Sequence, residues 1–175
     1  NPHDTICQED HHRLLGKIKK EVYKTFRANL LQWTHMSGNP PIERHPLRSG
    51  IPCVKHECVQ CCIETRMPIS HVDIDRISRL GYRPEDFVVE TGEGAQLKNR
   101  YNKCVFLSKS GCSIYPHRPE GCRLYPLIYD EDIHKAVLDN LCPWRCEYEI
   151  GDDDIQALRH LVRSLRSKRK GDRRL

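Results

Sequence analysis

Ten cysteines in a chain of 175 residues constrain the fold more than any other feature of this sequence. Four of them lie between Cys53 and Cys62, in a C-x4-C-x2-C-C arrangement. Thiolates are soft ligands that bind zinc, copper(I) and iron–sulfur clusters, and short spacers let one loop place several sulfurs around one centre. This stretch therefore predicts one half of a metal-binding core, which later cysteines complete.

A disulfide framework is the competing interpretation of so many cysteines, because secreted chains use them as cross-links. Cys61 and Cys62 are adjacent, which is awkward for disulfide pairing but suits two metal positions. The spacings are also short and clustered, and the chain is longer than the usual disulfide-stapled domain. We therefore expect reduced thiols in a cytoplasmic protein. No run of about 18 apolar residues and no signal-peptide pattern is visible, so we expect no membrane association.

The predicted metal ligands are the nine cysteines outside the N-terminal segment: Cys53, Cys58, Cys61, Cys62, Cys104, Cys112, Cys122, Cys142 and Cys146. A C-x4-C-x2-C run with a distant fourth cysteine is the ligand spacing of plant-type ferredoxins. Zinc sites more often use pairs of C-x2-C, and within the first stretch only Cys58 and Cys61 form one. Eight thiols would complete two four-thiolate centres, and nine could hold a multinuclear zinc cluster, so the count alone leaves these alternatives open.

Two arginines, Arg118 and Arg123, lie on either side of Cys122 and are the predicted cofactor-binding residues. Cationic donors to sulfur stabilise an anionic thiolate cluster and raise its potential. Surface charge or ion pairing is the plainer role for both. His56 lies between two predicted ligands, and a solvated loop histidine is its commoner role.

Hydrophobic periodicity predicts a long helix from about Asp10 to His35 and a final helix that starts near Asp152. A capping box at Ser70 should open a short helix that Gly81 ends. That helix should direct three apolar residues inward: Ile74, Ile77 and Leu80. Pro84 should begin another short helix. The apolar face of the final helix consists of Ile155, Leu158, Leu161, Val162 and Leu165.

Strand patterns predict one hairpin in which Cys104 and Cys112 flank the turn Ser108–Gly111, and a second strand pair between Tyr125 and Val137. The predicted fold class is α+β, mostly helical and irregular. It is a small cysteine-rich, metal-centred domain with a short β-hairpin, flanked by an N-terminal and a C-terminal helix. The predicted divisions are residues 1–49, 50–148 and 149–175.

The basic character of the chain, with a net charge of +5, belongs to its C-terminal end. From Arg159 to Leu175 there are eight lysines or arginines and one aspartate. Such a run could contact nucleic acid or an acidic partner. A solvated basic helix end is the commoner outcome, and no aromatic residues are interleaved there.

The segments Cys104–Leu107, Gly111–Tyr115 and Arg118–Pro126, together with the first cysteine stretch, resemble the YkgJ-like cysteine-cluster family. The resemblance covers roughly residues 50–148. That family is described as zinc- or iron-chelating, so the resemblance implies metal binding. A related cysteine domain occurs in flagellin lysine methylases, but no glycine-rich strand–turn–helix for S-adenosylmethionine is visible here.

The favoured function is a metal-binding protein with thiolate-ligated iron–sulfur cluster(s), with 4Fe–4S as the favoured type, that transfers electrons or assists a partner enzyme. The first alternative is a zinc-stabilised structural module that docks a protein or nucleic acid. The second is an enzyme with a cluster-based active site, although no catalytic residues stand out. A protein partner is expected, and nucleic acid is the less favoured one.

Overall fold

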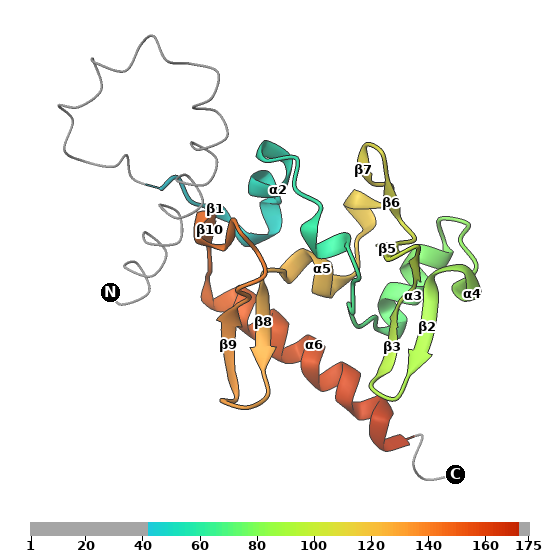
Figure 1. The fold of residues 1–175 in the computed structure, drawn as a ribbon. Helices are drawn as coiled ribbons and strands as arrows, with labels where there is room; N and C mark the ends of the chain where they lie inside the picture. The colour runs from blue at the N-terminus through green and yellow to red at the C-terminus, as the bar shows by residue number, and fades with distance from the viewer. Residues whose placement is uncertain (1–41, 172–175) are drawn as a thin grey trace, which may run out of the picture. The chain divides into compact units, whose positions relative to one another are not determined.

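The computed structural model describes residues 42–171, with side chains described as far as residue 166. The helix predicted from Asp10 to His35 lies outside the described residues. Contacts divide the chain into two units, Asn1–Arg44 and His45–Leu175, and the second unit contains the helices and strands described. This unit mixes helices with small two-stranded sheets, so the α+β class is confirmed (Figure 1).

Short elements dominate the unit, and only the last helix is long. The α-helices are α2 (Ile51–Lys55), α3 (His71–Ser78), α4 (Pro84–Phe87), α5 (Glu120–Leu124) and α6 (Asp152–Gly171). Single turns of 3-10 helix are η2 (Leu47–Ser49), η3 (Gln60–Cys62), η4 (Tyr115–His117) and η5 (Arg145–Glu147). The strands pair two by two: β1 (His45–Pro46) with β10 (Tyr148–Glu149), β2 (Val88–Thr91) with β3 (Gly94–Leu97), β4 (Asn99–Arg100) with β5 (Lys103–Cys104), β6 (Leu107–Ser108) with β7 (Gly111–Cys112), and β8 (Leu127–Asp130) with β9 (Lys135–Leu138).

Helix α3 begins with the predicted capping box. The Ser70 hydroxyl accepts from the Asp73 N–H at 3.2 Å, and the Asp73 carboxylate accepts from the Ser70 N–H at 3.2 Å. Ile77 is fully buried, as predicted, but Leu80 is 42% exposed. The prediction for Leu80 is wrong because the helix ends at Ser78, so Leu80 no longer shares its inward face.

The predicted hairpin around Ser108–Gly111 is present as β6 and β7, with Leu107 opposite Cys112. Cys104 does not belong to it, and pairs instead with Asn99 in the separate hairpin β4–β5. That hairpin turns at Tyr101 and Asn102, whose φ angles are +52° and +61°. Positive φ at both central residues is the geometry of a tight two-residue turn. Since this one contains no glycine, the sequence pattern did not reveal it.

Two further hairpins, β2–β3 and β8–β9, come before and after these strands in the chain. The β2–β3 hairpin was not predicted, whereas the pair predicted between Tyr125 and Val137 is present as β8 and β9. The β1–β10 pair is parallel and brings residues 45–46 beside 148–149. None of the helices among the described residues is long and apolar enough to cross a membrane.

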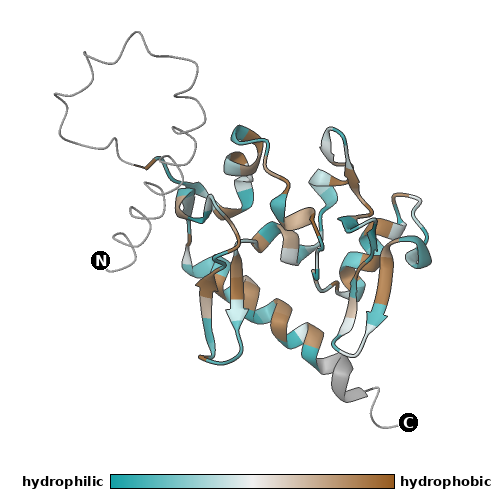
Figure 2. Ribbon diagram, in the orientation of Figure 1, coloured by the Kyte–Doolittle hydropathy of each residue, from teal (hydrophilic) through white to brown (hydrophobic). Residues whose placement is uncertain are grey.

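Buried side chains form two separate cores. The first core consists of Leu47, Leu124, Leu127, Cys142, Tyr148, Leu158 and Leu161. The second core consists of Ile69, Ile77, Phe87, Leu97, Cys104, Phe106 and Ile114. The remaining apolar residues predicted for the last helix pack against the first core, so α6 belongs to the same unit as the cysteines. Along α6, apolar residues recur between polar ones at intervals of three and four, as in an amphipathic helix (Figure 2).

Candidate metal centre

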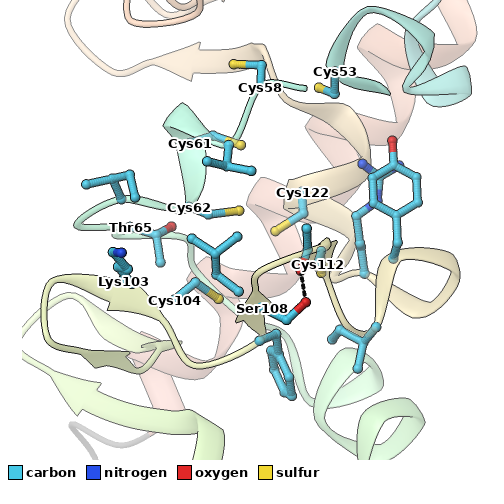
Figure 3. A pocket seen from close by; sticks show the side chains of 18 of the residues that line it. Cys53, Cys58, Cys61, Cys62, Thr65, Lys103, Cys104, Ser108, Cys112 and Cys122 are labelled. Carbon is cyan, nitrogen blue, oxygen red and sulfur yellow. Dashed lines mark hydrogen bonds between the residues drawn. The ribbon is translucent and has the colours of Figure 1, made fainter. Parts of the chain in front are cut away.

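Seven free cysteines line one cavity of about 1040 Å³. They come from both halves of the domain, and Figure 3 shows them gathered around one space. The seven are Cys53, Cys58, Cys61, Cys62, Cys104, Cys112 and Cys122. Within residues 42–166, no three ligand-type side chains are already gathered at the spacing of ligands to one ion. The thiols therefore line a cavity that is wider than the ligand sphere of a single metal ion.

Local structure explains how the first four thiols reach the cavity. Cys53 lies on α2, and the chain turns back through Glu57, whose φ is +48°. The Cys58 N–H donates to the Cys53 carbonyl at 2.9 Å, which closes this turn. Cys61 and Cys62 follow on η3. The sequence predicted a ligand loop with a turn of helix at its end, and the structure adds the helix at its start.

Backbone donors surround several of the thiols. Three sulfurs each accept a hydrogen bond from the backbone N–H two residues further on: Cys104 from Phe106, Cys112 from Ile114, and Cys142 from Trp144. The Cys104 sulfur accepts a second one from the N–H of Leu107. Hydrogen bonds of this kind stabilise the anionic form of sulfur, which is the form that binds metal.

Burial opposes this effect at most of the thiols. Desolvation raises the pKa of Cys53, Cys104, Cys112 and Cys122, and raises that of Cys142 to about 12. Cys61 differs, because a hydrogen bond with Cys62 lowers its pKa to about 7, whereas the pKa of Cys62 rises. Metal binding must therefore displace protons from most of these thiols, which makes the affinity depend on pH.

Arg118 is one of three cationic side chains that line the cavity, with Lys103 and Lys109. Its guanidinium lies 3.8 Å from the centre of the Tyr115 ring, and it also lines the cavity. Its positive charge adds to the lowering of the Cys61 pKa and partly offsets the rise that burial causes in the Cys112 pKa. Its buried Nε has no hydrogen-bond partner among the described residues. These contacts suit the role predicted for Arg118 beside an anionic centre.

Arg123 has a different environment. Its guanidinium donates to two backbone carbonyls, those of Pro116 and Arg118. It does not line the cavity, and it holds together the loop that carries Arg118. Its cofactor-binding role therefore receives no support from the geometry.

Two predicted ligands lie outside the cavity lining. Cys142 is 7% exposed and belongs to the first core. Cys146 is disulfide-bonded in the structure, so it has no free thiol to offer a metal. The roles of Cys142 and Cys146 as ligands therefore stay predictions.

His56 is fully engaged beside the cysteines. Its ring stacks on Trp144 at 3.5 Å between centroids, and its Nε2 lies 2.7 Å from the buried carboxylate of Glu147. Lys55 also pairs with Glu147, at 3.2 Å. This histidine therefore anchors α2 to the segment before β10.

Tyr148 is a site residue that sequence reasoning missed. Its hydroxyl lies 3.1 Å from the Cys53 sulfur, in hydrogen-bond contact, and its side chain is buried in the first core. Because a thiolate can only accept, the tyrosine is the donor whenever Cys53 is ionised. No signal in the sequence links the two residues, which are 95 positions apart.

A thiol-lined cavity with backbone donors to sulfur defines a metal-binding class of domain. In agreement, residues 52–147 match the family CxxCxxCC, described as "Putative zinc- or iron-chelating domain". This match covers more than half of the chain, so the chain belongs to this family, as its resemblance predicted. The domain is a metal-binding one. Neither the curated proteins nor the solved structures contain a match.

Proposed function

We propose that the cavity holds iron–sulfur chemistry and that the domain exchanges electrons with a protein partner. The observation that carries the proposal is the set of seven thiols around about 1040 Å³. A structural zinc ion takes four ligands at about 2.3 Å from sulfur, so one ion uses neither this many thiols nor this volume. A polynuclear centre such as a 4Fe–4S cluster, which is also held by four thiolates, fills more of this volume than a single ion does. More than one such centre would use more of the thiols.

The surroundings of the thiols support redox chemistry. Backbone N–H donors and the Arg118 guanidinium act on sulfur, and hydrogen bonds and net charge are the features that set the potential of an iron–sulfur cluster. We place the domain in a reducing compartment such as the cytoplasm, because eight cysteines of residues 42–171 carry free thiols and one, Cys146, is disulfide-bonded.

The mouth of the cavity supports a protein partner. Three apolar side chains that line the cavity remain exposed to solvent: Val54 at 68%, Val59 at 37% and Ile63 at 37%. Two lysines, Lys103 and Lys109, line the same cavity. Apolar surface next to a redox centre gives a partner a place to dock within electron-transfer distance.

Anaerobic purification followed by iron, zinc and sulfide analysis tests the proposal. We expect a coloured protein with equal amounts of iron and acid-labile sulfide, and a visible band that dithionite bleaches. A colourless protein with stoichiometric zinc and no sulfide would refute the proposal and favour a zinc-stabilised docking module.

A further inference from the structure

We infer that the eight free thiols form two four-thiolate metal sites that meet at the adjacent pair Cys61 and Cys62. Site A consists of Cys53, Cys58, Cys61 and Cys142. Site B consists of Cys62, Cys104, Cys112 and Cys122. The inference rests on the proposed function only for the kind of metal, because the division follows from packing and position.

Packing against the two cores divides the thiols. Cys142 is part of the first core, and Cys53 packs against that core. Cys104 is part of the second core, and the other three thiols of site B pack against it: Cys62, Cys112 and Cys122. Each group therefore has its own apolar wall, which is how two separate centres would be shielded from water.

Position in the cavity gives the same division. In Figure 3, Cys53 and Cys58 lie together at one end, while Cys62, Cys104 and Cys122 point into the space at the other end. Electrostatic interactions place Cys61 between the two groups. Cys142 interacts with Cys53, Cys58 and Cys61, whereas Cys122 interacts with Cys61, Cys104 and Cys112.

Spacing assigns Cys61 to site A. It completes the C-x4-C-x2-C run with Cys53 and Cys58, and Cys142 supplies the distant fourth thiol of that ligand spacing. Cys61 is exposed, whereas its neighbour Cys62 packs on the second core. Adjacent side chains that differ in this way can ligate two different centres but not easily the same atom.

Each site also has its own hydrogen-bond donors to sulfur. In site A, the Tyr148 hydroxyl contacts Cys53 and the Trp144 N–H reaches Cys142. In site B, backbone N–H groups donate to the sulfurs of Cys104 and Cys112. Such donors orient ligands and are characteristic of complete metal sites. Both sites would accept an iron–sulfur cluster or a zinc ion.

Native mass spectrometry of the full chain, purified anaerobically, counts the centres. We expect two in the unaltered chain, and one each in the double variants Cys53→Ser/Cys142→Ser and Cys104→Ser/Cys112→Ser, so that each halves the metal content. The control Cys146→Ser should retain both centres. One centre in the unaltered chain, or complete loss in either double variant while that variant remains folded by circular dichroism, would overturn the inference.

A second measurement uses only the unaltered chain, so misfolding of a variant does not affect its result. The metal-free full chain, titrated anaerobically with Co²⁺, should develop thiolate-to-cobalt absorption up to two equivalents, and saturation at one would overturn the two-site arrangement. The two proposals also fail separately. Zinc in both sites would refute iron–sulfur chemistry and leave the division intact, whereas a single iron–sulfur centre would do the opposite.

Discussion

Replacing Gly50 with alanine should lower the free energy of unfolding by more than the same replacement at another glycine with a positive φ angle. Gly50 precedes α2 with φ +65° and ψ +10°. A Cβ built there would lie 1.8 Å from the Tyr115 hydroxyl oxygen and 3.5 Å from an Arg118 guanidinium nitrogen. The same hydroxyl donates to the Gly50 carbonyl at 3.3 Å. One methyl group therefore meets both backbone strain and a packed ring.

The magnitude follows from three contributions. A left-handed backbone costs alanine roughly 1–2 kcal/mol. A contact of 1.8 Å forces the half-buried Tyr115 to move by more than an ångström, and overpacking of this kind costs about 1–3 kcal/mol. The lost hydrogen bond adds about 1 kcal/mol. We expect a total decrease of about 3–6 kcal/mol in the free energy of unfolding.

Gly81→Ala is the matched control. Gly81 also has a positive φ, +95°, but nothing lies within 4 Å of its Cβ position. It should therefore lose only the backbone contribution, about 1–2 kcal/mol. Urea unfolding followed by circular dichroism, on samples of equal metal content, gives both values. Equal losses in the two variants would refute the crowding of Gly50 by Tyr115.

Three other changes test the site and its support. Asp73→Ala should lower the free energy of unfolding by about 3–5 kcal/mol in urea titrations. The Asp73 carboxylate is 1% exposed and accepts hydrogen bonds from Arg76 in α3 and from the Glu120 N–H at the start of α5, so its removal leaves the half-buried Arg76 without its carboxylate partner. The exposed Asp86→Ala should change stability little, and similar effects for the two would contradict this account. Tyr148→Phe should keep the fold but weaken one metal about tenfold in chelator competition, because Cys53 loses its donor; an unchanged affinity would argue against it. The stability of the metal-free chain should pass through a maximum at about pH 8. Cys61, with a pKa of about 7 against 9.0 when unfolded, adds stability as the pH rises from 7 to 9. Six thiols with raised pKa values lose stability from about pH 8 upward, as the same thiols begin to ionise in the unfolded chain, and together they outweigh Cys61. Urea midpoints that rise steadily from pH 7 to about pH 10.5 would contradict this.

Local signals in the sequence predicted the parts of the fold that local chemistry controls. The capping box at Ser70 and the amphipathic helix from Asp152 depend on residues within a few positions of each other. The hairpin turn before Gly111 is of the same kind, and its glycine has φ +102°. These elements were predictable because the residues that stabilise them are neighbours in the chain.

Long-range pairing was not predictable in this way. Strands β1 and β10 have two residues each and join positions about a hundred residues apart. The contact between Tyr148 and Cys53 likewise depends on tertiary packing. Cys142 was predicted as a ligand from its residue type, but its burial in the first core could not be read from a loop-like C-P-W-R-C stretch. In each case, the deciding contact lies outside any local pattern.

The adjacent cysteines Cys61 and Cys62 limit the distance between the two proposed centres. Consecutive Cα atoms are about 3.8 Å apart, and a thiolate ligand reaches its metal at about 2.3 Å from sulfur. Two centres ligated by Cys61 and Cys62 therefore lie within about 15 Å of each other, because these lengths and the two side chains limit how far apart the metals can be. At that separation, an electron that reaches the exposed side at Cys61 is one short step from the centre held against the second core. In the proposed arrangement, the pair would link a site that has one exposed ligand, Cys61, to a site packed on the second core, which would suit electron exchange with a docked partner.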